Sequence, residues 1–206
     1  MEATYKKLCD TASDINEHLP TLRKYAEECE TIFETGVRGV VSSWAFADGL
    51  RTNGKDIKSL YVNDISPCAI NDLSRECEAS GITLQSEWKN NLELDMNGKE
   101  FDMTFIDTWH VYGQLKRELE KFAPVTKKYI VMHDTTVDEV HGETMRCMGG
   151  RPTAERQSKE TGIPVEEIVR GLWPAVTEFL EAHDDWELRE RFTNNNGLTI
   201  LKKIDC

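Results

Sequence analysis

Two acidic and two imidazole side chains follow two apolar runs in the second half of the sequence. Asp107 and His110 come after one run, and His133 and Asp134 come after the next. If both runs are neighbouring buried strands, the four side chains meet at one edge of a sheet. An unpaired carboxylate is costly there, and two converging carboxylates either raise each other's pKa or share a cation. The pattern therefore predicts a charged site above the sheet.

The chemistry suggested by these residues is metal-assisted activation of a hydroxyl group. We expect Asp107, His133 and Asp134 to hold a divalent ion; oxygen ligands suit Mg²⁺ or Mn²⁺, and an imidazole favours Mn²⁺. Such an ion orients two vicinal oxygens and lowers the pKa of a hydroxyl, whose proton His110 could take. In this hypothesis Asp107 and His110 are catalytic. The alternative is that Asp134 caps the next segment and the histidines are structural.

A second candidate site surrounds two glycines near the start of the chain. Ile32–Ser43 is typical of a strand, a glycine loop and a helix, in which Gly36 and Gly39 allow a close approach that a Cβ would block. The pattern is E-x-G-x-x-G, whereas loops that bind a pyrophosphate favour G-x-G-x-x-G. Glu34 would repel a pyrophosphate and suits the cationic part of S-adenosylmethionine. The alternative is a plain strand, turn and helix.

Other residues extend this predicted cofactor site. Asp64 ends the next apolar run, where a carboxylate can accept both ribose hydroxyls, although it could equally cap the following helix. Ser86 follows the third run and is a candidate partner for adenine. Arg38 could pair with a carboxylate of the cofactor or substrate, or could equally be a surface charge. The predicted cofactor-binding residues are Glu34, Gly36, Arg38, Gly39, Ser42, Asp64, Ser86 and Asp107.

The elements that must position these residues alternate between apolar runs and amphipathic stretches, which is typical of a parallel sheet wrapped by helices. The predicted parallel strands are Thr31–Thr35, Ser59–Asp64, Ile82–Gln85, Phe101–Ile106 and Lys128–Met132. The predicted helices are one or two within residues 5–29, broken near Pro20, and then Ser42–Leu50, Pro67–Ser80, Val111–Phe122 and Pro174–Ala182.

The last part of the chain predicts a hairpin. Trp186–Phe192 and Leu198–Lys203 are joined by Thr-Asn-Asn-Asn-Gly, which suits the positive φ angles of a tight turn. A hairpin cannot be a parallel crossover, so one of its strands runs antiparallel to the others. The expected fold is α/β and Rossmann-like: a mostly parallel seven-stranded sheet with helices on both faces and a C-terminal antiparallel hairpin, as in class I methyltransferases.

The length of 206 residues fits a single domain, 1–206, with an N-terminal helical segment over residues 1–30. The polar stretch that begins at Thr135 is too long for an ordinary connection. We interpret residues 135–170 as an active-site lid, with a short helix near Thr153–Lys159. Either Glu143 or His141 from this lid could also reach the metal.

Two stretches of sequence resemble a known family. Phe101–Glu118 (FDMTFIDTWHVYGQLKRE) and Lys128–Thr136 (KYIVMHDTT) resemble the class I O-methyltransferases of cephalosporin biosynthesis and macrolide-sugar modification. The resemblance extends through Gly171–Val176 and the closing hairpin, roughly over residues 30–203. Relatives of this group methylate sugar hydroxyls, including rhamnose units of glycans in large DNA viruses, so the resemblance implies a sugar O-methyltransferase, either free-standing or as a domain of such a glycan enzyme.

The resemblance also implies roles for particular residues. It implies a divalent metal on Asp107 and Asp134, and a histidine base at His110, which matches the Asp-x-x-His spacing of the group. Macrolide-sugar relatives have Glu-Asp after the fifth strand, where this chain has His133-Asp134. The third protein ligand is therefore left open between His133 and a residue of the lid.

Composition limits the remaining classes. The net charge of −12 argues against an enzyme that tracks a nucleic-acid backbone, and 39% hydrophobic residues suffice for a core. No run approaches the ~18 apolar residues of a membrane span, and Met1–Asp10 is unlike a signal peptide. The six cysteines form no C-x-x-C pair, which favours reduced thiols over disulfides or zinc. We expect a cytoplasmic protein.

These observations predict an S-adenosylmethionine-dependent O-methyltransferase that acts on a hydroxyl of a sugar or glycan, with a divalent metal and a histidine base. One alternative is a catechol-type O-methyltransferase with a small aromatic acceptor. Another is a nicotinamide-dependent oxidoreductase, although the phosphate-binding glycines are missing. The last is a methyltransferase-like module without turnover. Fusion to or association with glycosyltransferase domains and homo-oligomer formation stay open, as do the acceptor and the metal.

Overall fold

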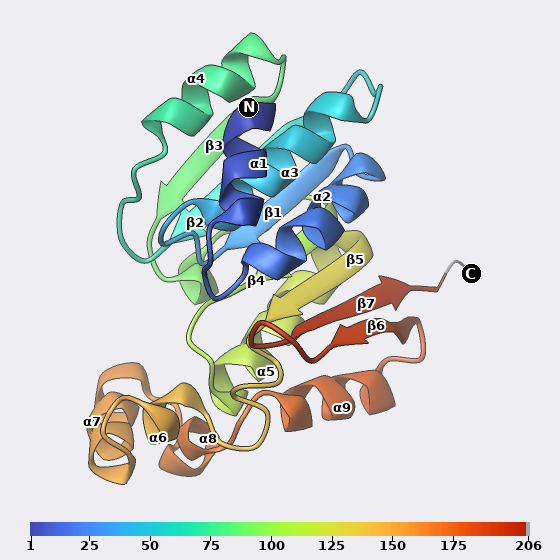
Figure 1. The fold of residues 1–206 in the computed structure, drawn as a ribbon. Helices are drawn as coiled ribbons and strands as arrows, with labels where there is room; N and C mark the ends of the chain where they lie inside the picture. Colours follow the sequence, from blue (N-terminus) through green and yellow to red (C-terminus); the bar gives the residue numbers. More distant parts are fainter. Residues whose placement is uncertain (205–206) are drawn as a thin grey trace.

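The computed structural model describes residues 1–204; residues 205 and 206, the last two of the predicted domain, lie outside the described part. Seven strands form one sheet (Figure 1). They are β1 (Thr31–Thr35), β2 (Ser59–Asp64), β3 (Thr83–Trp88), β4 (Phe101–Ile106), β5 (Thr126–His133), β6 (Trp186–Phe192) and β7 (Leu198–Lys203). The α-helices are α1 (Glu2–Asp10), α2 (Leu19–Glu27), α3 (Val41–Thr52), α4 (Asn71–Ala79), α5 (Tyr112–Phe122), α6 (Glu143–Arg146), α7 (Arg151–Thr161), α8 (Val165–Val169) and α9 (Trp173–Ala182). Single 3-10 turns are η1 (Asn16–His18), η2 (Asn91–Glu93) and η3 (Ala123–Val125).

The strand order is β3-β2-β1-β4-β5-β7-β6. The first five strands pair in parallel, while β7 runs antiparallel to both β5 and β6. The predicted mostly parallel seven-stranded sheet with its C-terminal hairpin is therefore confirmed. The order of the strands reverses between β1 and β4, and in open α/β sheets ligands bind beside such a switch point, at the carboxyl ends of the strands.

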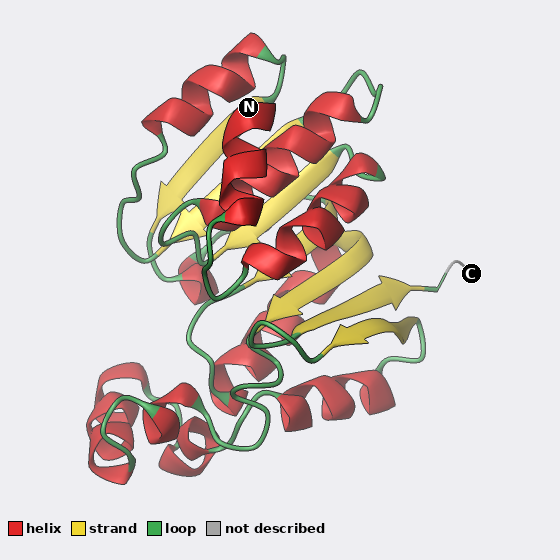
Figure 2. Ribbon diagram, in the orientation of Figure 1, coloured by secondary structure: helices red, strands yellow, loops and turns green. Residues whose placement is uncertain are grey.

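Alternating side chains of the central strands supply two cores, one on each face of the sheet. Ile32 packs on one face with residues of α2, α3 and α4, such as Phe46. Its neighbour Phe33 packs on the other face with residues of α5 and α9, such as Leu115 and Phe179. Because successive residues of a strand point to opposite faces, a sheet covered on both sides needs the continuous apolar runs that the sequence has. Figure 2 shows the helices on both sides of the strands.

Several predicted boundaries are wrong, among them those of the fifth strand, which runs over Thr126–His133 instead of Lys128–Met132. Pro20 does not break a helix; it lies in the first turn of α2, where its missing N–H costs nothing, and the break falls at residues 11–15 instead. The third strand runs over Thr83–Trp88 instead of Ile82–Gln85. The helix expected from Pro67 starts only at Asn71.

The stretch from residue 135 to 170 contains the short helices α6, α7 and α8, which lie together beside the N-terminal end of α5 (Figure 1). The helix expected near Thr153–Lys159 is α7, which is longer than predicted. Ile163 and Ile168 bury their side chains against Val111, next to the start of α5. Within residues 1–204, no helix has the length and apolar character needed to cross a membrane.

Candidate active site

A cavity of about 360 Å³ opens at the carboxyl ends of β1, β2 and β4. Each of these strands delivers polar residues to it directly after its last apolar residues. The lining residues are Thr35, Gly36, Arg38, Asn63, Asp64, Ile65, Asn90, Asn91, Asp107, Thr108, Trp109, Gln114 and Thr161. The cavity therefore lies at the switch point of the sheet, where the sequence predicts cofactor binding.

Gly36 sits where the loop after β1 touches the loop after β4. Its φ is +88°, and a Cβ on this residue would overlap the carbonyl group of Asp107. Its N–H donates to the carbonyl of Asn63 at 2.9 Å, which ties the loop to the end of β2. Only glycine allows this approach, so Gly36 brings the first loop and Asp107 to the same wall of the cavity.

Asp64 is held in place by backbone amides. Its Oδ2 accepts hydrogen bonds from the N–H groups of Val37 (2.9 Å) and Arg38 (3.0 Å), and its Oδ1 accepts one from Ser66 (3.1 Å). Burial alone would raise the pKa of Asp64, but these hydrogen bonds outweigh it and lower the pKa. The carboxylate therefore stays ionised beside the cavity. The guanidinium of Arg38 is exposed and pairs with Asp14.

Glu34 is placed differently from the prediction that it binds a cofactor directly. Its side chain is fully buried, and its two carboxylate oxygens accept hydrogen bonds from the hydroxyls of Ser42 and Ser43. Burial raises its pKa to about 7, against the lowering effect of these two hydroxyls. Glu34, Gly39 and Ser42 do not line the cavity; they join the end of β1 to the start of α3.

Ser86 is also outside the cavity lining. It lies within β3 opposite Val62 and is exposed. Because β3 continues to Trp88, the residues that follow it and reach the cavity are Asn90 and Asn91. The sequence reasoning missed these two, and a correct end for the third strand would have pointed to them.

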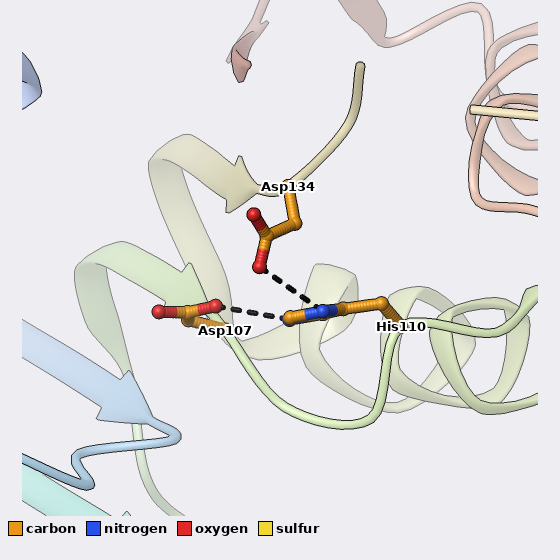
Figure 3. A group of neighbouring side chains, drawn as sticks. All are labelled: Asp107, His110 and Asp134. Atoms are coloured by element: carbon orange, nitrogen blue, oxygen red, sulfur yellow. Dashed lines mark hydrogen bonds and ion pairs between the residues drawn. The ribbon is translucent and has the colours of Figure 1, made fainter. Parts of the chain in front are cut away.

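The acid and histidine side chains meet as the sequence predicts (Figure 3). His110 lies between two carboxylates: its Nε2 is 3.0 Å from Asp107 Oδ1, and its Nδ1 is 3.0 Å from Asp134 Oδ2. Two acids of the 135–170 stretch approach the same Nδ1, Glu143 at 3.3 Å and Asp138 at 3.4 Å. Burial alone would lower the pKa of His110, but the nearby carboxylates of Asp107, Asp138 and Glu143 raise the pKa well above the usual value.

His133 completes this group. Its Nε2 lies 3.2 Å from the carbonyl of Asn195. Because a carbonyl only accepts, Nε2 must carry the proton, and in the neutral ring Nδ1 then has a free lone pair. That Nδ1 is 3.5 Å from Asp107 Oδ1 and 3.7 Å from Asp134 Oδ1. Within residues 1–204 it makes no hydrogen bond of proper geometry.

The donor atoms of this group fit a divalent metal. Three buried atoms of this group form no hydrogen bond of proper geometry within residues 1–204: Nδ1 of His110, Nδ1 of His133 and Oδ1 of Asp134. Asp107, His110 and Asp134 each offer an atom within 4.8 Å of the others. Asp134 also has a positive φ of 57°, a strain that non-glycine residues tolerate mainly at functional positions. Oxygen and imidazole donors together suit Mn²⁺ well and Mg²⁺ less well.

The 135–170 stretch is hydrogen-bonded to the loop that follows β4. The indole N–H of Trp109 donates to Thr144 Oγ1 at 3.1 Å, and the N–H of Glu143 donates to the carbonyl of His110 at 2.9 Å. Of the two residues of this stretch that the sequence suggests as further ligands, Glu143 reaches the group. His141 instead forms a backbone bridge with Arg170.

Comparisons with known proteins identify the fold. No protein-family profile matches the sequence, and no curated protein matches it by sequence. Among solved structures, the chain is similar to the O-methyltransferase TomG of Streptomyces achromogenes, involved in tomaymycin synthesis and solved with S-adenosylmethionine (TM-score 0.61, 14% identity, covering 95% of this chain and 82% of TomG). It is also similar to an O-methyltransferase of Bacillus cereus in complex with S-adenosylhomocysteine (TM-score 0.59, 13% identity, 98% and 90% covered).

A third similar structure is a candidate caffeoyl-CoA O-methyltransferase of Staphylococcus aureus (TM-score 0.56, 18% identity, 91% and 83% covered). The likeness spans nearly the whole chain, so the protein has the Rossmann-like fold of the class I S-adenosylmethionine-dependent methyltransferases. At these identities the likeness is one of fold. The narrower resemblance to the cephalosporin and macrolide-sugar group stays a prediction.

Proposed function

We propose that this protein is an S-adenosylmethionine-dependent O-methyltransferase. The observation that carries the proposal is the position of Asp107, which lines the cavity on one side and contacts His110 on the other. A ligand in the cavity and a second molecule at the acid and histidine group would then meet at one residue. Transfer of a group between two bound molecules requires this arrangement.

The cavity would hold the methyl donor, which supplies an electrophilic methyl group on its sulfonium. The ionised Asp64 would accept hydrogen bonds from the ribose hydroxyls. Gly36 lets the donor approach the backbone of the loop, and the next two amides of the loop hold Asp64 in place for it. Glu34 would act indirectly, by anchoring the loop through Ser42, in place of the direct contact that the sequence suggested.

The metal would be held by Asp107, His133 and Asp134, and when bound it would orient two neighbouring acceptor oxygens and lower the pKa of the attacking hydroxyl. Burial by itself raises the pKa of Asp107, but the nearby imidazoles of His110 and then His133 outweigh it and keep that pKa far below its usual range. Asp107 therefore stays ionised. His110 could act as the base only in its neutral form, with the carboxylates of Asp107 and Asp134 engaged by the metal. Its Nδ1 would then take the hydroxyl proton, and Asp107, which contacts Nε2, would stabilise the resulting imidazolium.

We further propose a sugar hydroxyl as the acceptor, supported by the sequence resemblance, and residues 135–170 as the lid over it. A catechol-type acceptor is the second candidate, because one similar structure is described as a candidate caffeoyl-CoA O-methyltransferase. Both acceptors present neighbouring oxygens to the same site. A screen of glycosides against catechols with methyl-labelled S-adenosylmethionine separates the two.

Calorimetry with S-adenosylhomocysteine tests the donor half of the proposal, and absence of binding at high micromolar ligand would refute it. Asp107→Asn and EDTA test the metal half. Each should reduce turnover on the order of a thousandfold, while S-adenosylhomocysteine affinity changes little. Asp56→Asn is the matched control. Asp56 is an exposed acid that does not line the cavity, so this variant should keep full activity. Full activity in EDTA would contradict the metal role.

A further inference from the structure

Beneath the cavity lies a group of buried polar side chains that the proposed reaction does not use. Its centre is Glu118 on α5, whose side chain is 1% exposed. Glu118 Oε1 accepts hydrogen bonds from Thr108 Oγ1 at 2.5 Å, Asn91 Nδ2 at 2.6 Å and Gln114 Nε2 at 2.8 Å. All three donors line the cavity, while Glu118 itself does not. Burying a carboxylate costs free energy, so we expect Glu118 to have a role at this position.

The carboxylate fixes the orientation of two amide side chains. Because Glu118 Oε1 accepts, the amide atoms that face it must both be NH₂ groups. The oxygen of Asn91 then points the other way, where it accepts the second N–H of Gln114 at 3.1 Å. Thr35 supports this orientation, since its Oγ1 accepts from Asn91 Nδ2 at 3.0 Å.

Gln114 is left with one free polar atom. Both of its N–H groups are used within the network, and no described residue donates a hydrogen bond to its Oε1. Gln114 lines the cavity, so it presents a hydrogen-bond acceptor there, and it cannot rotate to present a donor without breaking two buried hydrogen bonds. The cavity wall is thereby built for a ligand that carries an N–H or O–H donor.

We propose that Gln114 Oε1 accepts a hydrogen bond from the 6-amino group of the adenine ring, and that Glu118 is the positioning residue that enforces this selectivity. The inference rests on the proposed binding of S-adenosylmethionine. Among the donors of that molecule, the ribose hydroxyls suit Asp64, and the cationic amino group suits a carboxylate better than a neutral amide. The neutral 6-amino group matches a neutral acceptor, and the flat indole of Trp109 lines the same cavity.

Asn90 supplies a second group of opposite kind. Its Oδ1 accepts from the N–H of Leu92 at 3.0 Å, which leaves its NH₂ group for the cavity that it lines. Adenine offers an amino donor next to ring-nitrogen acceptors. A 6-oxo purine would instead set its oxygen against Gln114 Oε1, and two acceptors repel each other in a partly buried site.

The test compares the binding of S-adenosylhomocysteine and S-inosylhomocysteine by calorimetry in EDTA, so that neither metal nor acceptor takes part. The natural protein should prefer the adenine ligand by at least about tenfold. In Gln114→Leu that ratio should fall to within about threefold. Asp64→Asn is the control, since it should weaken both ligands alike and leave the ratio unchanged.

The ratio of the affinities for the two ligands also tests the role of Glu118. Glu118→Gln can keep an acceptor oxygen for the three donors and should retain the preference, whereas Glu118→Met should lose it. If S-adenosylhomocysteine binds and the natural protein does not discriminate, or if Gln114→Leu keeps the full ratio, the inference is wrong and the proposed function stands. If neither ligand binds to the natural protein, both the inference and the proposed function are wrong. Should Glu118→Met fail to fold, the first comparison still decides.

Discussion

Glu34 illustrates how a single buried acid can make the stability of a protein depend on pH. Its pKa is raised to about 7 in the folded state because burial disfavours the charged form. The unfolded chain ionises it near the usual value, so the unfolded state is favoured increasingly as pH rises from there toward 7. The stability that neutral Glu34 permits is therefore present below the usual pKa and is lost as pH rises through about 7.

Glu34→Gln should remove this dependence, because a neutral amide cannot ionise and can still pair with the hydroxyls of Ser42 and Ser43. Relative to the natural protein, the variant should gain on the order of 2 kcal/mol in its free energy of unfolding between pH 5 and pH 8. Urea titrations at several pH values measure it. Parallel pH profiles for the two proteins would show that Glu34 is already ionised in the fold.

At the scale of elements, the turn between β6 and β7 supports the metal site. The carbonyl of Asn196 accepts hydrogen bonds from the N–H groups of Thr136 and Val137, both at 3.0 Å, just after Asp134. The carbonyl of Asn195 holds His133. The turn therefore holds both the backbone that follows β5 and the side chain of His133, although it lies about sixty residues further along the chain.

Gly197 makes this contact feasible. Its φ is +98°, and a Cβ would overlap both the side chain and the backbone nitrogen of Thr136. Gly197→Ala should cost at least about 2 kcal/mol of stability, from backbone strain together with displacement of Thr136. It should also weaken Mn²⁺ binding, measured by calorimetry.

Gly98→Ala is the matched control. Gly98 has a φ of +71°, but a Cβ there would meet no atom within 4 Å, so this variant carries strain without a clash. It should lose only about 1 kcal/mol and bind Mn²⁺ normally. Equal losses in the two variants would contradict a supporting role for the turn.

The strands differ in how far the sequence predicts them. β1, β2, β4 and both hairpin strands have the predicted bounds, because apolar or alternating runs end there at turn residues. β3 is an edge strand paired only with β2, and most of its side chains are exposed or half-buried. Its hydrophobic pattern is therefore weak, and both of its predicted ends are wrong.

The candidate site follows the same logic. The meeting of Asp107 and Asp134 could be predicted, since neighbouring parallel strands end at the same edge of a sheet. The roles of Asn91 and Gln114 could not, because they depend on hydrogen bonds to Glu118 that join separate segments of chain. Propensity and spacing carry no information about which atom of an amide stays free.

At the scale of the whole molecule, an acidic protein with net charge −12 gathers four carboxylates around one histidine. A divalent ion that binds only the folded state should stabilise it by about 2.7 kcal/mol at a hundred times its Kd. Thermal denaturation should therefore show a higher Tm with Mn²⁺, and a separate increase with S-adenosylhomocysteine.

Asp134→Asn separates the two effects. This variant should lose most of the Mn²⁺-dependent rise in Tm and keep the rise caused by S-adenosylhomocysteine, because Asp134 does not line the cavity. Potassium chloride at matched ionic strength controls for screening of the general negative charge. An undiminished Mn²⁺ effect in the variant would place the ion elsewhere.

The turn that holds His133 also bears on the order in which the protein folds. Its Asn194 carbonyl accepts from the His18 ring, a contact that closes a loop of 176 residues, and Asn195 accepts from the N–H of Glu17. Contacts between such distant segments form late, because the entropy of closing the loop must be met before the contact stabilises anything. During refolding, the strands at the centre of the sheet can pair well before this junction exists. Tight metal binding should then emerge only in the last kinetic phase, so that Mn²⁺ affinity reports the joining of the first and last segments of the fold.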